Sequence, residues 1–426
     1  MYMLNLLIEI LREPAILVGL IACVGLVAQK ETMTNVLKGS VKSTLGFVVL
    51  GGGASILIGS LDNFGAMFEY GFGINGVVTS NEATVAQGLY QYGSQIALVM
   101  LFAMIANMIF ARFTRFKYIF LTGHHTLFMA CVITVVLASG GIDGILLVMI
   151  GSIFLGFMMA VFPYIMQPLM RKVTNSDDIA MGHFGTSGYL VAAGIAKIVG
   201  KNSKSTEDMN LPKSLEFLKD TSVSISLTMF ILFLIVSIAA GPYYVETELS
   251  NGTSFIVFAL IQAITFSAGV FVILSGVNLV LAEIVPAFKG ISEKIVPNAK
   301  PALDCPIVFP YASNAVLMGF ISSFLGGIVG LIVLLLISNS GVNVPIVLPG
   351  VVPHFFTGAA AGVFANATGG RKGCFFGAFA NGLLVTFLPV PLISALSSLE
   401  LNNTTFSDTD YAVIGVILES IVNMFR

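Results

Sequence analysis

Few ionisable side chains interrupt the long apolar segments of this chain, and the sharpest candidates for chemistry are one acid and two histidines. Asp304 lies in ALDCPIVFPY, His124 in LTGHHTLFMA and His183 in MGHFGTSG. A charge at the centre of a bilayer costs about 2.5 to 3.5 kcal/mol on insertion scales, so such a residue requires a partner or a function. A carboxylate and two imidazoles can form hydrogen bonds with the hydroxyl groups of a small polar solute.

Asp304 has two compatible interpretations. Its carboxylate can accept hydrogen bonds from two hydroxyls of a sugar, and the nearby Asn314 adds a further polar group. Alternatively, Asp304 caps a helix that starts near Pro306, since Asp before a Pro at the first helical position is a good N-cap. The sequence does not decide between a ligand and a cap.

The histidines also have two interpretations. His124 and His125 are adjacent, and adjacent helical positions point about 100 degrees apart, so we expect one to face a ligand and the other to pack. His183 follows Gly182, and a small neighbour lets the backbone approach a ligand closely. The alternative for each is an interfacial or loop histidine that bonds to the backbone. His354 is near the cytoplasmic end of its expected span, so we expect it to snorkel or to cap a helix and not to bind a ligand.

The elements that must position these residues are membrane helices. Hydrophobic residues make up 56% of the chain and charged residues 10%, against about 25% charged in an average soluble domain. When the apolar stretches are threaded across a membrane, every Lys and Arg after Arg12 falls on one side, as in cytoplasmic loops. The loops on the other side, such as the connection from Leu61 to Gln95, contain Asp and Glu but no Lys or Arg. The net charge of -2 argues against nucleic acid as a partner.

A spanning helix needs about 20 apolar residues, and the chain offers about eleven such stretches. They lie near residues 14–29, 44–60, 94–111, 118–138, 144–167, 222–240, 254–284, 315–337, 346–370, 374–397 and 411–425. Two segments should break this pattern: Pro345 to Gly373 as a broken or re-entrant helix, and Met181 to Gly200 as a hairpin entering from the cytoplasm. The expected fold is an all-α polytopic membrane protein with re-entrant hairpins.

A basic connection divides the chain. We expect a first membrane half over residues 1–170, a cytoplasmic connection with a re-entrant hairpin over 171–221, and a second membrane half over 222–426. Five expected spans precede the connection, and an odd first half would place a related second half upside down. Two inverted-repeat halves that form scaffold and core domains are therefore the expected arrangement.

No cofactor, metal site or catalytic residue is expected. The four cysteines are far apart in apolar sequence, without CxxC spacing or a histidine at metal-ligand distance in sequence; they are Cys23, Cys131, Cys305 and Cys374. The glycine run Leu50 to Ser55 lacks the preceding strand and following Lys of a phosphate loop. Residues 1–12 place Leu and Ile at helical spacing and predict a short interfacial helix.

The chain resembles the ascorbate-type IIC membrane component of the phosphoenolpyruvate-dependent sugar phosphotransferase system, in the ascorbate/galactitol superfamily. The resemblance covers essentially the whole chain, and residues 281–320 are the most specific part. The motifs that carry it are FVVLGGGASIL, GINGVV, LTGH, MGH, LAEIVPAFKGISEKIVPNAKPALDC, FPYASNAVLMGF and FANATGG.

This resemblance implies a multi-pass protein of the bacterial cytoplasmic membrane, surrounded by lipid. It implies a homodimer in which a scaffold domain holds the dimer contact and a core domain moves the sugar as an elevator. A separate cytosolic IIB protein, supplied by IIA, would phosphorylate the bound sugar from a phosphocysteine. The phosphoryl donor would therefore lie on the partner, which leaves open whether this chain counts as an enzyme.

The resemblance also implies which residues bind the substrate. The matching positions are Asn81, Glu82, His124, Phe128, His183, Phe184 and Asp304. Only His124, His183 and Asp304 carry the family's residue, and on this basis His124 should contribute more to binding than His125. The ascorbate proteins have Thr and Tyr at the first two positions and Gln at both Phe positions. Since ascorbate is an anion and Glu82 would oppose it unless protonated, the implied substrate is L-ascorbate or a related sugar or polyol.

Two other functions compete with inward transport coupled to phosphorylation. The first is an ion-coupled secondary transporter that moves an unmodified small polar solute. The second is a purely structural membrane scaffold, which the buried polar groups disfavour. Uptake measured without the cytosolic phosphotransferase proteins distinguishes the first from phosphorylation-coupled transport.

Overall fold

The computed structural model describes residues 14–73, 76–209, 220–396 and 404–424, so the helix expected over residues 1–12 lies outside the described residues. The first part of the chain forms α2 (Pro14–Ala28), α3 (Met33–Phe72), β1 (Gly76–Thr79), α4 (Asn81–Phe113), β2 (Tyr118–Phe120), α5 (Gly123–Ser139), α6 (Gly144–Thr174), β3 (Ala180–Met181), α7 (Thr186–Val199) and η1 (Thr206–Asp208). The second part forms α8 (Thr221–Ala240), α9 (Pro242–Tyr244), η3 (Val245–Leu249), α10 (Phe255–Ile295), β4 (Lys300–Leu303), η4 (Cys305–Tyr311), α11 (Ser313–Asn339), β5 (Ile346–Leu348), α12 (Val351–Pro353), η5 (His354–Gly358), α13 (Ala359–Phe387), α14 (Pro389–Ala395), β6 (Thr404–Thr405) and α15 (Thr409–Met424). The described chain is predominantly helical, as the sequence predicts.

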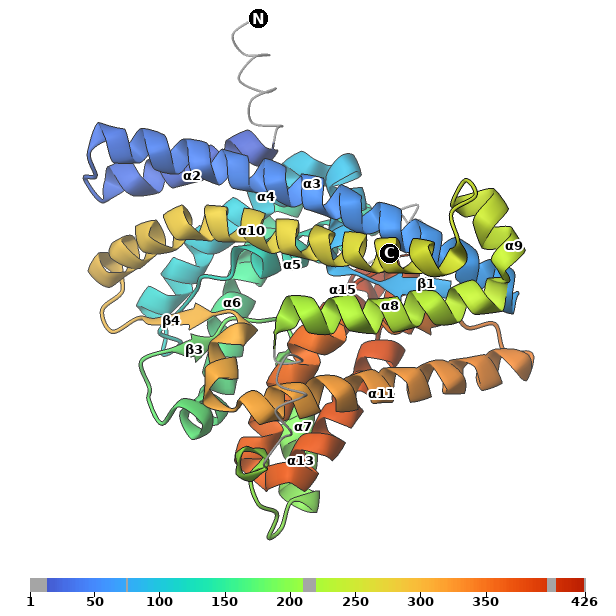
Figure 1. Ribbon diagram of the computed structural model, residues 1–426. Helices are drawn as coiled ribbons and strands as arrows, with labels where there is room; N and C mark the ends of the chain where they lie inside the picture. The colour runs from blue at the N-terminus through green and yellow to red at the C-terminus, as the bar shows by residue number, and fades with distance from the viewer. Residues whose placement is uncertain (1–13, 74–75, 210–219, 397–403, 425–426) are drawn as a thin grey trace, which may run out of the picture.

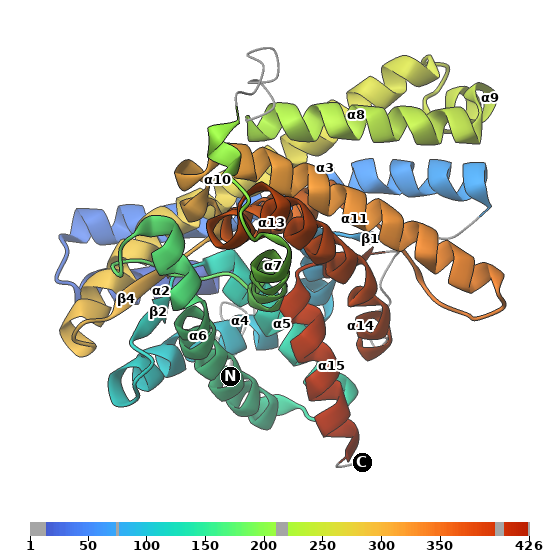
Figure 2. The same ribbon diagram turned by 90° about the horizontal axis from the view of Figure 1, so that it is seen from below.

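Four helices, α2, α3, α8 and α10, run roughly alongside one another and form a layer (Figure 1). α3 begins after Thr32, whose side chain caps its N-terminus, and ends at Gly73, whose φ of 65° favours glycine. Along the contact between α3 and α10, the hydroxyl of Ser60 donates a hydrogen bond of 3.0 Å to the carbonyl oxygen of Gln262. α7 lies between α13 on one side and α6 and α15 on the other (Figure 2).

The number of membrane spans differs from the sequence expectation. Six described helices are long and apolar enough to cross a membrane, or seven if the pair formed by α8 and the α9–η3 segment, bent by 105°, counts as one span. The expected eleven are not confirmed. The helices α2, α5, α7 and α15 are shorter than the about 20 residues of a full crossing. The stretches expected near 346–370 and 374–397 belong to one bent helical run, Val351–Ala395.

The connection expected from Leu61 to Gln95 is largely helical instead. α3 continues to Phe72 as a helix of 40 residues, and α4 begins at Asn81. Polar and glycine residues in the last turns of α3 lower its hydropathy and hide this extension from a search for apolar stretches. Burial of Met67 in the core shared with α8 and α10 stabilises these turns.

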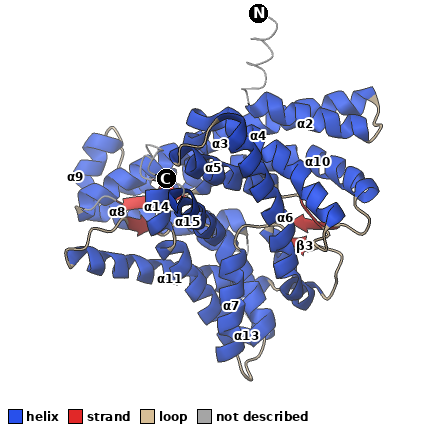
Figure 3. Ribbon diagram, turned by 180° about the vertical axis from the view of Figure 1, so that it is seen from behind, coloured by secondary structure: helices blue, strands red, loops and turns tan. Residues whose placement is uncertain are grey.

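The break expected between Pro345 and Gly373 lies at Gly369 and Gly370, inside α13. The backbone leaves the helical conformation at both glycines, and Gly370 has a φ of 60°, which favours glycine. The two arms of α13 then run back along each other. They approach so closely that a Cβ added at Gly373 would lie only 2.8 Å from the carbonyl oxygen of Ala365. The tip of this hairpin packs against the C-terminal end of α7, and the two helices project together (Figure 3).

Two small parallel sheets connect distant parts of the chain. One has the strand order β5-β1-β6 and the other the order β2-β4-β3. In the first, Val77 pairs with Val347; in the second, Ile119 pairs with Pro301. Each sheet therefore has a central strand from one part of the chain and two outer strands from the other. Two inverted related halves would produce this reciprocal exchange, and the repeat itself stays a prediction.

The two sheets bring together the loops that follow their strands. Within a parallel sheet, the carboxyl ends of the strands lie at the same edge. Each of the six strands is followed within a few residues by a helix N-terminus: that of α4, α5, α7, η4, α12 or α15. The residues between strand and helix are thus brought together from six separate places in the sequence.

Candidate functional site

A pocket lies at the carboxyl ends of these six strands. It is lined by Asn81, Glu82, His124, His125, Phe128, His183, Asp304, Cys305, Val352, Pro353, Phe356 and Asp408. Every strand contributes at least one of these residues through the segment that follows it. Six of the seven residues predicted to bind substrate line this one pocket, and Phe184 does not.

Asp304 both caps a helix and faces the pocket, so the two interpretations of the sequence hold together. Its carboxylate accepts a hydrogen bond of 2.6 Å from the backbone N–H of Cys305 at the start of η4. The same carboxylate lies 3.3 Å from Nε2 of His124 and 4.0 Å from Nε2 of His183. The expected help from Asn314 is absent, because that amide donates to the carbonyl oxygen of Thr206.

Both His124 and His125 face the pocket, so the expectation that one of them only packs is wrong. Nε2 of His125 lies 3.7 Å from the Asp304 carboxylate, almost as close as that of His124. Both residues belong to the first turn of α5. The N-terminus of α5 points toward the pocket, so side chains 100 degrees apart around its axis both reach it.

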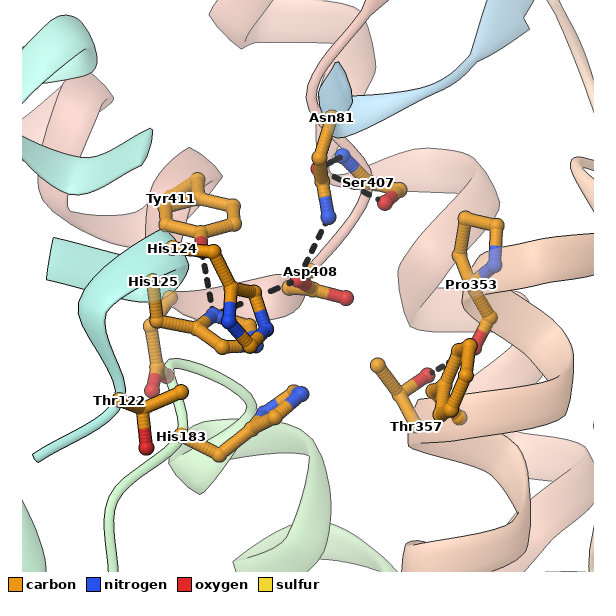
Figure 4. Close-up of polar contacts among 12 residues, drawn as sticks. Asn81, Thr122, His124, His125, His183, Pro353, Thr357, Ser407, Asp408 and Tyr411 are labelled. Carbon is orange, nitrogen blue, oxygen red and sulfur yellow. Dashed lines mark hydrogen bonds and ion pairs between the residues drawn. The ribbon is translucent and has the colours of Figure 1, made fainter. Parts of the chain in front are cut away.

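Tyrosine hydroxyls hold two of the imidazoles from behind. Nδ1 of His125 lies 2.5 Å from the hydroxyl of Tyr411, and Nδ1 of His183 lies 3.0 Å from that of Tyr189. In both rings the other nitrogen, Nε2, is left facing Asp304 (Figure 4 shows His125 and Tyr411). By contrast, Nδ1 of His124 is buried without a hydrogen-bond partner among the described residues.

Asn81 is held by the segment that precedes α15. Its amide nitrogen donates 2.7 Å to the carboxylate of Asp408, and its oxygen accepts from the backbone N–H and the hydroxyl of Ser407 at 2.9 Å (Figure 4). Asn81 is 7% exposed and Asp408 2%. This contact joins the start of α4 to the start of α15 and places a third carboxylate, after Glu82 and Asp304, on the pocket.

Asp410, in the first turn of α15, fixes α7, which follows His183. The Asp410 carboxylate accepts hydrogen bonds from the backbone N–H groups of Thr186 at 2.7 Å and Ser187 at 2.9 Å. It thereby satisfies two of the free N–H groups at the N-terminus of α7, where a negative charge is also stabilised by the helix dipole. The position of His183 therefore depends on a residue more than two hundred positions away.

On the other side of His183, an ion-pair cluster holds the loop between α6 and β3. Asp177 accepts 2.7 Å from Nε of Arg171 and 2.8 Å from the Gln167 amide, and it also pairs with Lys300 at the start of β4. The hydrogen bond from Arg171, followed by that from Lys300, holds the pKa of the Asp177 carboxyl well below its usual range. This cluster sets the approach of β3 to β4 and thus of His183 to Asp304.

Comparison with known proteins identifies the family. The family model described as the sugar-specific permease component of the phosphotransferase system (PTS), EIIC-GAT, matches residues 9–410. The chain belongs to this PTS permease family. It is also similar to the ascorbate-specific PTS system EIIC component of Mycoplasma pneumoniae, with 29% identity over 412 residues. That alignment covers 85% of this chain and 62% of the relative, so the chain spans less than two thirds of the relative's length.

Family membership and the apolar helices make this a multi-pass membrane protein. Glu82 and Phe128 are two positions at which the sequence resemblance implies a difference from the ascorbate proteins. Glu82 lies on the pocket, where Ser80 donates to its carboxylate at 3.4 Å. Phe128 also lines the pocket, edge-on to His124 with ring centroids 5.7 Å apart. Both side chains thus form part of the pocket wall.

Phe184 lies outside the pocket, unlike Glu82 and Phe128. It is fully buried and stacks on Phe120, with ring centroids 5.0 Å apart, and it also packs against Phe162 and Tyr411. The side chain directly after His183 points into this aromatic cluster, while His183 faces the pocket. Phe184 is thus not among the residues that line this pocket, and its expected part in substrate binding stays a prediction.

His354 lies away from the pocket and is fully buried, with Nδ1 2.9 Å from the hydroxyl of Ser323. Its position in the core excludes the expected snorkelling role. Sequence reasoning missed Cys305, Asp408 and Tyr411. For Asp408, the available signal was the acidic sequence SDTD at the start of an apolar stretch, which is typical of the N-terminal end of a helix.

Proposed function

We propose that this protein is a sugar-specific IIC permease in the bacterial cytoplasmic membrane that moves L-ascorbate or a related sugar or polyol inward, coupled to phosphorylation by a cytosolic phospho-IIB. Membership of the PTS permease family supports transport of a sugar, and the name of the M. pneumoniae relative supports ascorbate. The observation that carries the proposal is the convergence of His124, His183 and Asp304 in one pocket.

The chemistry of the pocket suits a small polyhydroxylated substrate. Glu82, Asp304 and Asp408 offer acceptors for hydroxyl groups, and imidazole nitrogens can donate or accept. Phe128 and Phe356 provide an apolar wall on which the face of a sugar can pack. An ionised carboxylate on the pocket wall opposes an anion such as ascorbate more than a neutral sugar, so the proposed substrate class includes neutral polyols.

Phosphorylation and the elevator movement complete the proposal. The layer formed by α2, α3, α8 and α10 would be the scaffold, including the dimer contact, and the pocket-bearing elements would be the mobile core. Support for this division comes from the packing of α2, α3, α8 and α10 alongside one another in a single layer. The phosphoryl group would come from a phosphocysteine of IIB, itself supplied by IIA, so no catalytic residue is assigned to this chain.

One observation favours the alternative of an ion-coupled secondary transporter. Asp408 is buried on the pocket between Asn81 and His125, and buried carboxylates and histidines carry protons in many transporters. Uptake of labelled L-ascorbate into vesicles that lack all cytosolic phosphotransferase proteins separates the two functions. We expect no concentrative uptake under a proton or sodium gradient. Accumulation of unmodified substrate driven by either gradient would support the alternative.

A further inference from the structure

The pocket brings together three imidazoles around one carboxylate. Nε2 of His124, His125 and His183 lies 3.3, 3.7 and 4.0 Å, respectively, from the nearest oxygen of Asp304. His124, His125 and Asp304 each offer a ligand atom within 4.8 Å of the other two. Imidazole nitrogen and carboxylate oxygen together form a donor set typical of divalent transition-metal ions.

We propose that this permease binds a divalent first-row transition-metal ion, of the class of Zn²⁺, through His124, His125, His183 and Asp304. Bonds of about 2.0 to 2.2 Å in a tetrahedral site separate neighbouring ligand atoms by about 3.3 Å. The contact between His124 and Asp304 already has this separation. His124, His125 and Asp304 already lie close enough together to share one ion, and His183, whose Nε2 is 4.0 Å from Asp304, would complete the four ligands after rotation of its side chain.

The groups behind the histidines support the same assignment. A histidine that binds a metal through one nitrogen usually forms a hydrogen bond through the other, which fixes the ring and its tautomer. Tyr411 contacts Nδ1 of His125, and Tyr189 contacts Nδ1 of His183. When each Nδ1 donates its proton to the tyrosine oxygen, both Nε2 lone pairs point at the negatively charged Asp304. That arrangement is repulsive unless a cation or a donor group lies between them.

The metal ion and the sugar would compete for the same atoms, and this part of the inference rests on the proposed function. A sugar hydroxyl needs the lone pairs of Asp304 and the histidines, which are the lone pairs that a metal ion occupies. Zn²⁺ would therefore inhibit the permease by excluding its substrate. No local sequence spacing reveals the site, because its ligands follow three different strands, β2, β3 and β4.

The test is a titration of the purified, chelator-treated full chain with ZnCl₂ by calorimetry, together with visible spectra recorded with CoCl₂. We expect one ion per chain and Co²⁺ absorption bands of a site with imidazole ligands. His183→Ala should weaken Zn²⁺ binding at least tenfold. Tyr189→Phe keeps every metal ligand but removes the hydroxyl that contacts Nδ1 of His183. This variant should weaken Zn²⁺ binding by about tenfold, as loss of a hydrogen-bond partner of a metal ligand usually does.

His354→Gln provides the matched control, because it alters the one histidine that lies away from the pocket, and it should leave the metal affinity unchanged. Absence of saturable binding to the wild-type chain, or binding that His183→Ala leaves intact, would overturn the metal site. The wild-type Co²⁺ spectrum decides the question even where a variant fails to fold.

Competition is measured separately by repeating the ZnCl₂ titration with L-ascorbate present, since Zn²⁺ is redox-inert. The apparent Zn²⁺ affinity should fall as ascorbate saturates the site. A thermal-shift experiment without metal measures separately how far ascorbate saturates the protein. If ascorbate binds and Zn²⁺ affinity stays constant, exclusion of the sugar is wrong. If Zn²⁺ binds and no sugar does, the metal site stands and the proposed function fails.

Discussion

The amide of Asn81 donates a hydrogen bond of 2.7 Å to the carboxylate of Asp408, although 327 positions separate the two residues in sequence. Both side chains are buried, and both line the pocket. The contact connects the element after β1 with the element after β6, which are neighbours in one sheet. The shape of the pocket thus depends on pairing between the two ends of the chain.

Asn81→Ala should lower both stability and substrate affinity. It leaves the buried Asp408 carboxylate without its amide donor, and an unsatisfied buried polar group costs about 1 to 3 kcal/mol. Thermal unfolding in detergent measures the loss. The double variant Asn81→Ala with Asp408→Ala should lose less stability than the sum of the two single variants. Strictly additive losses would show that the hydrogen bond contributes nothing.

Asp304→Asn should abolish sugar binding while the protein stays folded. Asn caps a helix about as well as Asp, so the start of η4 survives, whereas the charge that faces His124 and His183 is lost. Isothermal titration with L-ascorbate and with neutral polyols measures the effect, and thermal unfolding checks the fold. Retained binding in this variant would reduce Asp304 to its capping role.

His124→Ala and His125→Ala should differ in stability more than in binding. Both rings face Asp304, so each variant should lose at least tenfold in substrate affinity, with the larger loss for His124 at the family position. Only His125 also contacts Tyr411, so its variant should in addition unfold at a lower temperature, by about 1 kcal/mol of stability for one lost hydrogen bond. Equal unfolding temperatures would contradict this difference.

Phe128→Gln and Phe184→Gln should have opposite consequences. At the pocket wall, the amide of Phe128→Gln can bond to ring oxygens of ascorbate and should raise its affinity relative to neutral sugars. In the aromatic cluster, the amide of Phe184→Gln is buried without a partner and should destabilise the fold by about 1 to 3 kcal/mol. A thermal-shift screen against ascorbate, pentitols, hexitols and pentoses tests both. A gain in ascorbate affinity from Phe184→Gln would show that the side chain at this position does contribute to substrate binding.

Apolar stretches predict where helices lie, because a run of apolar residues is a local property. The sequence therefore locates α6, α8 and α11 closely. The strands are beyond such reasoning, since two to four residues carry no periodicity and their pairing joins segments hundreds of residues apart. Asp304 and His183 were recognisable as rare polar groups in apolar sequence. Asp408 was not, because its burial results from pairing of β6 with β1.

The central claim is that the substrate crosses this permease and is phosphorylated by IIB. Its most direct test is reconstitution of the purified protein into liposomes that contain phospho-IIB labelled with ³²P, followed by addition of ¹⁴C-labelled L-ascorbate or the best-binding polyol outside. We predict that the lumen gains a phosphate ester carrying both labels in equal amounts, and that Asp304→Asn abolishes its formation. Accumulation of the ¹⁴C compound above its external concentration without a phosphate label would contradict the account.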